Sequence, residues 1–219
     1  MAHPASLCFR LPENMDTIEG ALIEPLAVGF HAANQGGARL GQKAVVMGAG
    51  CIGLMTLLAL KAFGVTEVYV VDVMENRLAK AKELGAAGII NGKEQDAVEE
   101  LMRATAGKGM DLCIDTAGSQ ITMNQCIGAA AKGAAVVFVG YSAQDQVSLD
   151  INNALNKELT FKTVFRYRNL YPLAIEAVSQ GLNVKGVVTD FFKFDDVRKA
   201  MDLSVSNKAE IVKAVLSLR

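Results

Sequence analysis

Histidine and cysteine are scarce in this 219-residue sequence, which has two of the former and four of the latter. The histidines are His3 and His31, and the cysteines are Cys8, Cys51, Cys113 and Cys126. The cysteines form no C-x-x-C pair, and neither histidine occurs with a cysteine at the spacing of a zinc site. We therefore expect free structural thiols rather than disulfides or a metal site, with Cys51 and Cys113 inside apolar segments.

Long apolar runs and an excess of either charge are also absent. The most continuous apolar stretch, CIGLMTLLAL, stops at Lys61, well short of the roughly 18 to 20 residues that a membrane-spanning helix needs. The start, MAHPASLCFRLPEN, has neither the basic nor the apolar region of a secretory signal, so we expect a cytoplasmic protein. With 22 basic and 23 acidic residues, the net charge of −1 argues against nucleic acid or an anionic membrane as a partner.

From Lys43 onward, short β-branched runs alternate with longer segments of helical periodicity. This alternation predicts parallel strands joined by crossover helices, and hence an α/β sheet covered on both faces. The expected strands are 43–48, 67–72, 87–90, 110–118, 134–141 and 159–165. The expected helices between them are 51–64, 74–86, 94–107 and 119–133. Six strands are the number in a complete doubly wound dinucleotide-binding sheet, the Rossmann fold.

Both ends of the chain fall outside this six-stranded unit. A helical segment, 17–37, leads into the first strand, and two glycines mark its end. The remaining pattern predicts a helix near 171–181, a strand near 185–192, a helix near 194–205 and a strand near 210–218. Since six strands already make up the sheet, we expect the last two strands to belong to a second layer that this chain contains only in part.

Three glycines, spaced Gly48-x-Gly50-x-x-Gly53, close the first strand and open the first crossover helix. Gly48 would permit a tight turn, Gly50 would let the backbone approach a pyrophosphate, and Gly53 would let the helix pack closely on the sheet. Cys51 and Ile52 lie within the same expected cofactor contact. The free N–H groups and the positive dipole end of the helix would face the phosphates. A bare tight turn is the alternative, which this strand–glycine–helix context disfavours.

Asp72 follows Gly53 by 19 residues and ends the second strand, as a dinucleotide site requires. A carboxylate there accepts hydrogen bonds from ribose hydroxyls but repels a 2′-phosphate, so NAD is favoured over NADP. Arg77, five residues further on, could neutralise such a phosphate or be a solvated helix charge. Because the acid is present, we interpret Arg77 as support for the adenosine side of NAD.

Four segments of the chain are distinctive beyond the glycine motif. The segments ALIEPLAVGFHA, GAGCIGLM, VVDVMENRLAKAKELGA and VFRYRN closely resemble zinc-dependent medium-chain dehydrogenases, in particular the sorbitol (polyol) dehydrogenase branch. The resemblance covers essentially the whole chain. It implies hydride transfer between a secondary alcohol and NAD, with a zinc ion that polarises the substrate oxygen.

The resemblance also implies roles for individual residues. Glu24 matches a glutamate that supports the catalytic zinc directly or through water; on its own it could equally be a helix surface charge. Three residues match positions that line the cofactor, and two match positions beside the nicotinamide and substrate. The first group is Thr116, Gly118 and Val139, and the second is Phe165, with a core position as its alternative, and Arg166.

The chain departs from that family where the catalytic metal is concerned. In the family, the first half of the chain supplies a cysteine and a histidine to zinc, and that half has no counterpart here. His31 lies two helical turns from Glu24, too far for joint ligation, so a packed or capped histidine is expected. We expect 1–36 to be a remnant of a catalytic domain with a linking helix, 37–165 the Rossmann domain, and 166–219 the return to the catalytic domain. Such a chain would bind NAD weakly or moderately and would be inactive alone.

Two other functions stay open at this stage. The missing zinc ligands suit a stand-alone nucleotide-binding or regulatory module, and a zinc-free medium-chain reductase would need no metal. Homo-oligomerisation is expected through the sixth strand, because an apolar edge strand is usually paired or covered. The sequence does not identify the alcohol or polyol, because most of the substrate pocket would lie outside this chain.

Overall fold

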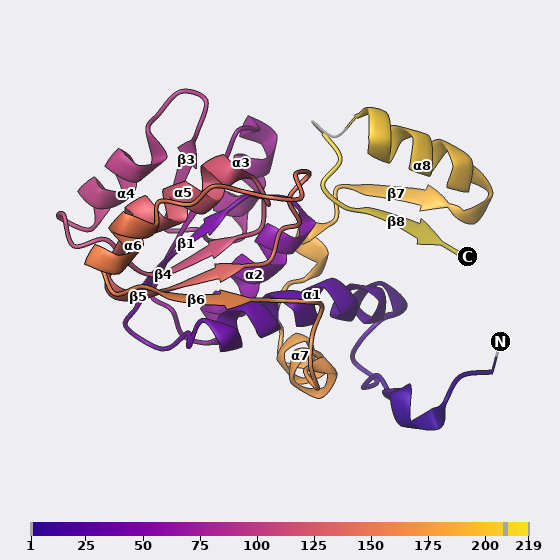
Figure 1. Ribbon diagram of the computed structural model, residues 1–219. Coiled ribbons are helices and arrows are strands. Elements are labelled where there is room, and N and C mark those ends of the chain that lie inside the picture. The colour runs from indigo at the N-terminus through magenta and orange to yellow at the C-terminus, as the bar shows by residue number, and fades with distance from the viewer. Residues whose placement is uncertain (1, 208–209, 219) are drawn as a thin grey trace.

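A six-stranded parallel sheet forms the centre of the protein in a computed structural model that describes residues 2–207 and 210–218 (Figure 1). The terminal segments predicted above include Met1, Lys208, Ala209 and Arg219, which lie outside the described residues. The strands are β1 (Lys43–Met47), β2 (Glu67–Asp72), β3 (Gly88–Asn91), β4 (Met110–Asp115), β5 (Ala130–Phe138) and β6 (Thr160–Thr163). Their order, β3-β2-β1-β4-β5-β6, confirms the predicted doubly wound Rossmann sheet.

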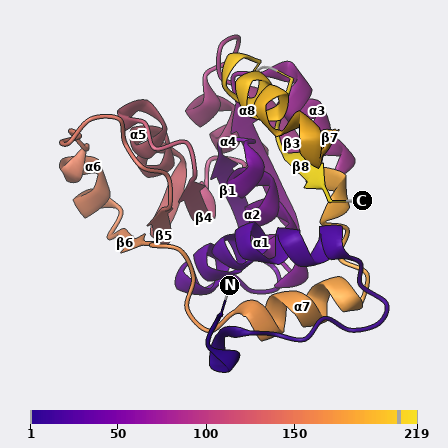
Figure 2. The ribbon, with the colours of Figure 1, turned by 90° about the vertical axis from the view of Figure 1, so that its right-hand side faces the viewer.

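Helices cover both faces of this sheet, with α2 and α5 on opposite sides of it (Figure 2). The helices are α1 (Thr17–Gln35), α2 (Cys51–Ala62), α3 (Glu75–Glu83), α4 (Ala97–Ala104), α5 (Gln120–Ala129) and α6 (Ile151–Asn156). Along β1, Ala44 and Val46 pack toward α1 and α2, whereas Val45 and Met47 pack toward α4 and α5. Because both faces are buried, the strand has no polar alternation and reads as one apolar run.

The helix that precedes the sheet, α1, is an integral part of the core. Asp16 accepts hydrogen bonds from the N–H groups of Ile18 and Glu19, and the Glu19 carboxylate accepts one from the N–H of Asp16, so a capping box begins the helix. Further along, Leu22 and Phe30 are almost fully buried against α2. The predicted linking segment is therefore anchored to the sheet by packing.

The C-terminal strands do not join the large sheet, as expected. After β6 come α7 (Tyr171–Ser179), β7 (Asp190–Lys193), α8 (Val197–Ser206) and β8 (Ala214–Ser217). Strands β7 and β8 pair in parallel as a separate two-stranded sheet, which lies with α8 to one side of the main body (Figure 1). Short 3-10 helices occupy Ala5–Leu7, Lys185–Val187 and Phe194–Asp196. The strand expected near 185–192 thus starts only at Asp190.

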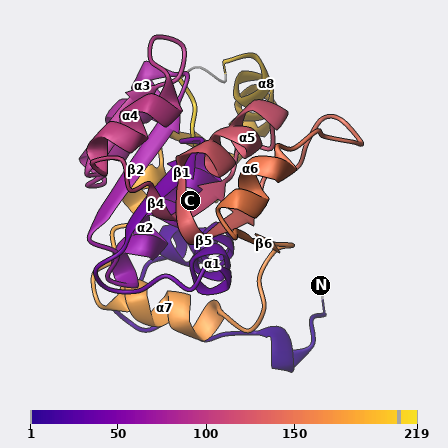
Figure 3. The ribbon, with the colours of Figure 1, turned by 60° about the vertical axis from the view of Figure 1, so that its left-hand side comes forward.

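Two local predictions were wrong. The helix expected over 119–133 ends at Ala129, because Ala130 is extended (φ −66°, ψ 140°) and pairs with Met110 of β4. The alanine-rich segment favours helix by propensity, but pairing in the sheet overrides that preference. Helix α6, which stands between β5 and β6 (Figure 3), was not predicted. It begins where the Asp150 carboxylate accepts a hydrogen bond from the N–H of Asn153.

Candidate functional site

The glycine turn between β1 and α2 has the geometry that each of its glycines was expected to provide. Gly48 has a φ of +100°, which a side chain disfavours, and its N–H donates to the carbonyl of Val71 at 2.7 Å. A Cβ on Gly53 would lie 1.8 Å from the Gly48 carbonyl oxygen, so the helix packs directly on the turn. A Cβ on Gly50 would meet no atom within 4 Å. The turn is closed on its inner side and open at Gly50.

Asp72 holds this turn from the neighbouring strand. One carboxylate oxygen accepts a hydrogen bond from the N–H of Ala49 at 2.6 Å. The other accepts from the N–H groups of Val73 at 2.7 Å and Met74 at 2.9 Å. The side chain is buried, with 8% of its surface exposed. Three N–H donors therefore hold the carboxylate in one orientation. The side chain also lines the cavity described below, where it can accept a further hydrogen bond.

Thr116 closes the turn from the other neighbouring strand, β4. Its hydroxyl lies 2.9 Å from the carbonyl oxygen of Met47 and 3.1 Å from that of Gly48, and its N–H donates to Met47 at 2.9 Å. A Cβ on Gly48 or on Gly53 would come within 2.9 Å of the Thr116 hydroxyl oxygen. These contacts explain why both positions lack a side chain.

A cavity of about 500 Å³ opens above these groups, at the carboxyl ends of the strands. It brings together five predicted site residues, Gly48, Gly50, Asp72, Arg77 and Thr116. It lies where the strand order reverses between β1 and β4, the usual ligand position in doubly wound sheets. Ser119, Thr122 and Gln125 add polar groups to its wall that were not predicted. A hollow of about 590 Å³ beside α7 contains none of the predicted residues.

Cys51 begins α2 and is only half-buried, less than was expected of a structural thiol. Burial raises the pKa of its thiol; the positive charge of Lys213 opposes this rise and the negative charge of Glu24 adds to it. The charges of Lys213 and Glu24 are therefore close enough to influence the first turn of α2 electrostatically. Lys213 was not singled out from the sequence, because only the folding of the C-terminal segment brings it to a turn 162 residues away.

The residues predicted beside the nicotinamide lie outside this cavity. Phe165 is 69% exposed, and the guanidinium carbon of Arg166 is 5.5 Å from the centre of its ring. The alternative that Phe165 is a core residue is therefore wrong. Arg166 has a φ of +55°, which is unusual outside glycine. Val139 is half-buried, and its N–H donates to the carbonyl of Asp115 at 2.8 Å. Gly118, with a φ of +70°, lies in the turn that follows β4.

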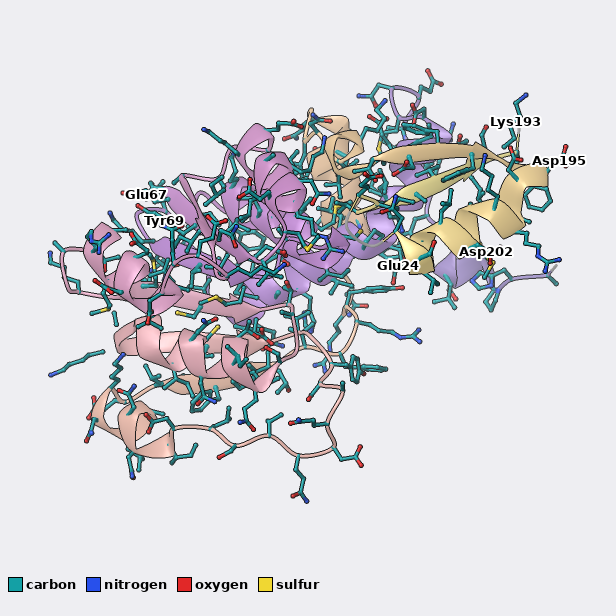
Figure 4. The ribbon with its side chains drawn as sticks, turned by 90° about the horizontal axis from the view of Figure 1, so that it is seen from above. Glu24, Glu67, Tyr69, Lys193, Asp195 and Asp202 are labelled. Atoms are coloured by element: carbon teal, nitrogen blue, oxygen red, sulfur yellow. The ribbon has the colours of Figure 1, made fainter. Side chains whose placement is uncertain are left out.

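Glu24 is exposed on α1, and in Figure 4 it is well separated from Glu67 and Tyr69. Burial raises the pKa of Tyr171, as do its hydrogen bond to the Tyr167 hydroxyl, at 2.9 Å, and the negative charge of Glu24. The charge of Glu24 therefore influences a hydrogen-bonded pair of tyrosines, Tyr167 and Tyr171, that was not predicted from the sequence. Within the described residues, no group of three or more histidine, cysteine, aspartate or glutamate side chains could hold a metal ion.

His31 is packed inside the protein, as expected, with 7% of its surface exposed. Its Nδ1 is buried and has no hydrogen-bond partner among the described residues. Burial lowers the pKa of the imidazole, and the positive charge of Arg168 lowers it further. All four cysteines are free, with Cys113 and Cys126 fully buried.

The parallel doubly wound sheet, the glycine turn and the acid at the end of the second strand together define a dinucleotide-binding fold. A comparison of the sequence with protein-family models identifies the family. Residues 51–180, more than half of the chain, match the model of the zinc-binding dehydrogenase family, and the chain belongs to that family. The predicted family resemblance is confirmed.

The matched relatives include a zinc-type alcohol dehydrogenase-like protein and several sorbitol dehydrogenases. The chain is 44% identical over 219 residues to the uncharacterized zinc-type alcohol dehydrogenase-like protein YdjJ of Escherichia coli (strain K12), covering 100% of this chain and 62% of that protein. It is 34% identical to the sorbitol dehydrogenase of Bacillus subtilis (strain 168), covering 95% of this chain and 59% of that protein. The chain thus spans about 60% of the length of these relatives.

Solved structures show the same fold. The E. coli protein ECK1772, an oxidoreductase/dehydrogenase of unknown specificity, superposes with a TM-score of 0.94 at 44% identity, covering 98% of this chain and 62% of that one. The alcohol dehydrogenase rspB of E. coli CFT073, complexed with NADH, superposes with a TM-score of 0.91 at 28% identity, covering 99% and 64%. In the part of this chain that the structure describes, no helix is long and apolar enough to cross a membrane.

Proposed function

We propose that this chain is the NAD-binding portion of a dehydrogenase that transfers a hydride between a secondary alcohol, such as a polyol, and NAD. One observation carries the proposal: Asp72 is hydrogen-bonded across to Ala49 of the glycine turn and lines a cavity of about 500 Å³. The sorbitol dehydrogenases among the relatives support the alcohol class, and the NADH complex of a structural neighbour supports the cofactor.

The residues present fit a dinucleotide. The open side of Gly50 leaves room for the pyrophosphate at the N-terminus of α2, where the first N–H groups of a helix have no partner within the helix and no side chain caps them in the described residues. Asp72 accepts a hydrogen bond from a ribose hydroxyl at Oδ2, because among the described residues that oxygen accepts only the Ala49 N–H whereas Oδ1 already accepts two. Its charge opposes a 2′-phosphate, so NAD is preferred to NADP, with Arg77 on the adenosine side. The nicotinamide ring, when bound, accepts or gives up the hydride.

At the other end of the site, we assign Thr116, Gly118 and Val139 to the cofactor wall and Phe165 to the nicotinamide face. Arg166 is assigned to the substrate, because its exposed guanidinium stands beside Phe165 and offers several N–H donors to alcohol oxygens. These groups bind and orient the reactants. Lys213, which acts at the first turn of α2, adds a positive charge on the phosphate side.

The described residues do not by themselves form a zinc site. Glu24 supplies one carboxylate toward such a site, directly or through water, with the other ligands coming from outside this chain. Residues 1–36 and 166–219 then belong with a catalytic domain, and 37–165 form the cofactor domain. The separate β7–β8 sheet and the roughly 60% coverage of the relatives support this division. Such a chain binds NAD weakly or moderately and does not oxidise alcohols alone.

We also assign the protein to the cytoplasm and expect it to form homo-oligomers through β6. The four free thiols suit a reducing compartment. Strand β6 is the last of the sheet, all four of its residues are exposed, and the ring of Phe161 is 5.7 Å from that of Phe138. An uncovered edge of this kind is available for pairing with a second copy.

Calorimetric titration with NAD and NADP tests the proposal. We expect the chain to bind NAD more tightly than NADP, and we expect Asp72→Ala to weaken NAD binding at least tenfold. Asp202→Ala is the matched control, because Asp202 is exposed on α8 and does not line the cavity. A folded wild-type chain that binds AMP but not NAD would support the stand-alone nucleotide module instead, and one that binds neither nucleotide would refute the cofactor assignment.

A further inference from the structure

Asp115, the last residue of β4, is a fully buried carboxylate that the cofactor site described so far does not use. One oxygen accepts a hydrogen bond from the N–H of Gly118 at 3.0 Å and the other from that of Ala117 at 3.3 Å. The nearby Thr122 hydroxyl also favours the charged form of the carboxylate. Among the described residues, no lysine, arginine or histidine forms an ion pair with it.

A buried carboxylate without a cation is costly, and burial raises the pKa of Asp115 against the opposing effect of the Thr122 hydroxyl and the two N–H donors. An ionised carboxylate differs from every other side chain of its size in being an acceptor only. It can therefore accept from both backbone N–H groups at once. It fixes the backbone turn that begins at Thr116 and continues to α5.

The carbonyl group of Asp115 reaches the next loop of the site. It accepts hydrogen bonds from the N–H groups of Val139 at 2.8 Å and Gly140 at 3.1 Å. The two loops also touch at their glycines, since a Cβ on Gly118 would lie 2.2 Å from the Tyr141 carbonyl oxygen. One residue thus fixes the turn after β4 with its side chain and the loop after β5 with its backbone.

Thr116 extends this link to the glycine turn, because its hydroxyl and N–H both bond to the end of β1. The chain of contacts therefore runs from Gly48 through Thr116 and Asp115 to Val139. Gly48 and Thr116 line the cavity of about 500 Å³, whereas Val139 lies outside it, in the loop after β5.

We propose that Asp115 is a positioning residue for the dinucleotide: it sets the loop after β5 at a fixed place relative to the glycine turn, so that both ends of NAD are held at once. This inference rests on the proposed NAD site. Asn at position 115 keeps the shape but turns an N–H₂ group toward one of the two backbone N–H donors. The turn after β4 then loses its fixed position, and the loop after β5, which touches that turn at Gly118, shifts with it, while Asp72 and Gly50 keep their places.

The test compares NAD with ADP-ribose, which lacks only the nicotinamide, by calorimetry on the 219-residue chain. We expect Asp115→Asn to weaken NAD binding at least tenfold and ADP-ribose binding less than threefold. Asp111→Asn is the matched control, because Asp111 lies at the other end of the same strand, is exposed, and accepts a hydrogen bond from the N–H of Lys43 at 2.8 Å. We expect this control to bind both ligands like the wild type.

A second variant, Thr122→Val, keeps the carboxylate and removes the hydroxyl that favours its charged form, and we expect a smaller change of the same kind. The ratio of NAD to ADP-ribose affinity should also fall at low pH in the wild type, as Asp115 takes up a proton, but not in Asp115→Asn. Asp72 is assigned to the ribose that both ligands contain, so it does not change the ratio of their affinities. The Cys126 thiol near Asp115 stays neutral because burial raises its pKa well above the usual value. Equal losses for both ligands, or no change in the ratio, would refute the positioning role. A wild-type chain that binds neither ligand would instead refute the NAD site itself.

Discussion

Two glycines of α1, Gly20 and Gly29, should respond in opposite ways to the same substitution by alanine. A Cβ on Gly29 would lie 2.7 Å from both backbone carbonyl atoms of Met55 and 2.8 Å from the N of Thr56. The obstacle is the backbone of α2, which cannot give way without moving the helix. A Cβ on Gly20 would meet only the end of the Leu11 side chain, at 2.5 Å, and that side chain can turn aside.

The magnitudes follow from helix propensity and overpacking. Gly→Ala inside a helix gains about 0.5 to 1 kcal/mol, and forcing a methyl group into a packed interior costs about 1 to 3 kcal/mol or more. We therefore expect Gly20→Ala to be neutral or slightly stabilising and Gly29→Ala to lose roughly 1 to 2 kcal/mol. For a chain of this size, that loss lowers the melting temperature by about 2 to 8 °C.

Thermal and urea unfolding of the two variants beside the wild type provide the assay. NAD titration adds a functional measurement, because Met55 lies one turn below the glycine turn on α2 and a displaced α2 would move the phosphate-binding N–H groups. We expect Gly29→Ala to bind NAD less tightly than Gly20→Ala. If Gly29→Ala were as stable as the wild type, the backbone contact between α1 and α2 would not be the constraint inferred here.

Two further predictions concern His31 and Gly50. Because the folded state lowers the pKa of His31, its contribution to stability is present above the unfolded value of about 6.5 and is lost as the pH falls below it. Urea unfolding between pH 5 and 8 should show this loss in the wild type and in the exposed control His3→Leu, but reduced in His31→Leu; an unchanged profile in His31→Leu would contradict the assignment. Gly50→Val should cost about 1 kcal/mol or less in stability, as its Cβ enters open space, yet weaken NAD binding at least tenfold. Normal NAD affinity in a folded Gly50→Val would show that the pyrophosphate does not approach there.

The sequence was most informative where one local rule decides the structure. Strand β1 is buried on both faces and therefore appears as a short apolar run between Gly41 and Gly48. The boundary at Ala130 was wrong because the deciding interaction, pairing with Met110, is made by a distant strand. Helix α6 is only six residues long and has too little periodicity to be recognised.

In the candidate site, too, the residues whose positions depend on local sequence could be predicted, and those whose positions depend on distant segments could not. Gly48, Gly50 and Gly53 could be assigned from spacing, because each backbone requirement is local to the turn. Lys213 and Asp115 could not, because neither belongs to a spaced motif. Their places depend on which segments the fold brings to the ends of β1 and β4.

The glycine turn is held almost entirely by groups that are distant in sequence: the carbonyl of Val71, the carboxylate of Asp72 and the hydroxyl of Thr116. An isolated segment 43–53 would therefore have no pre-formed phosphate site. The site comes into existence only when β1 has paired with both β2 and β4, so nucleotide binding is coupled to the pairing of three strands. A bound nucleotide should accordingly protect the amides of all three strands from hydrogen exchange, and the recovery of binding during refolding should report the completion of the sheet.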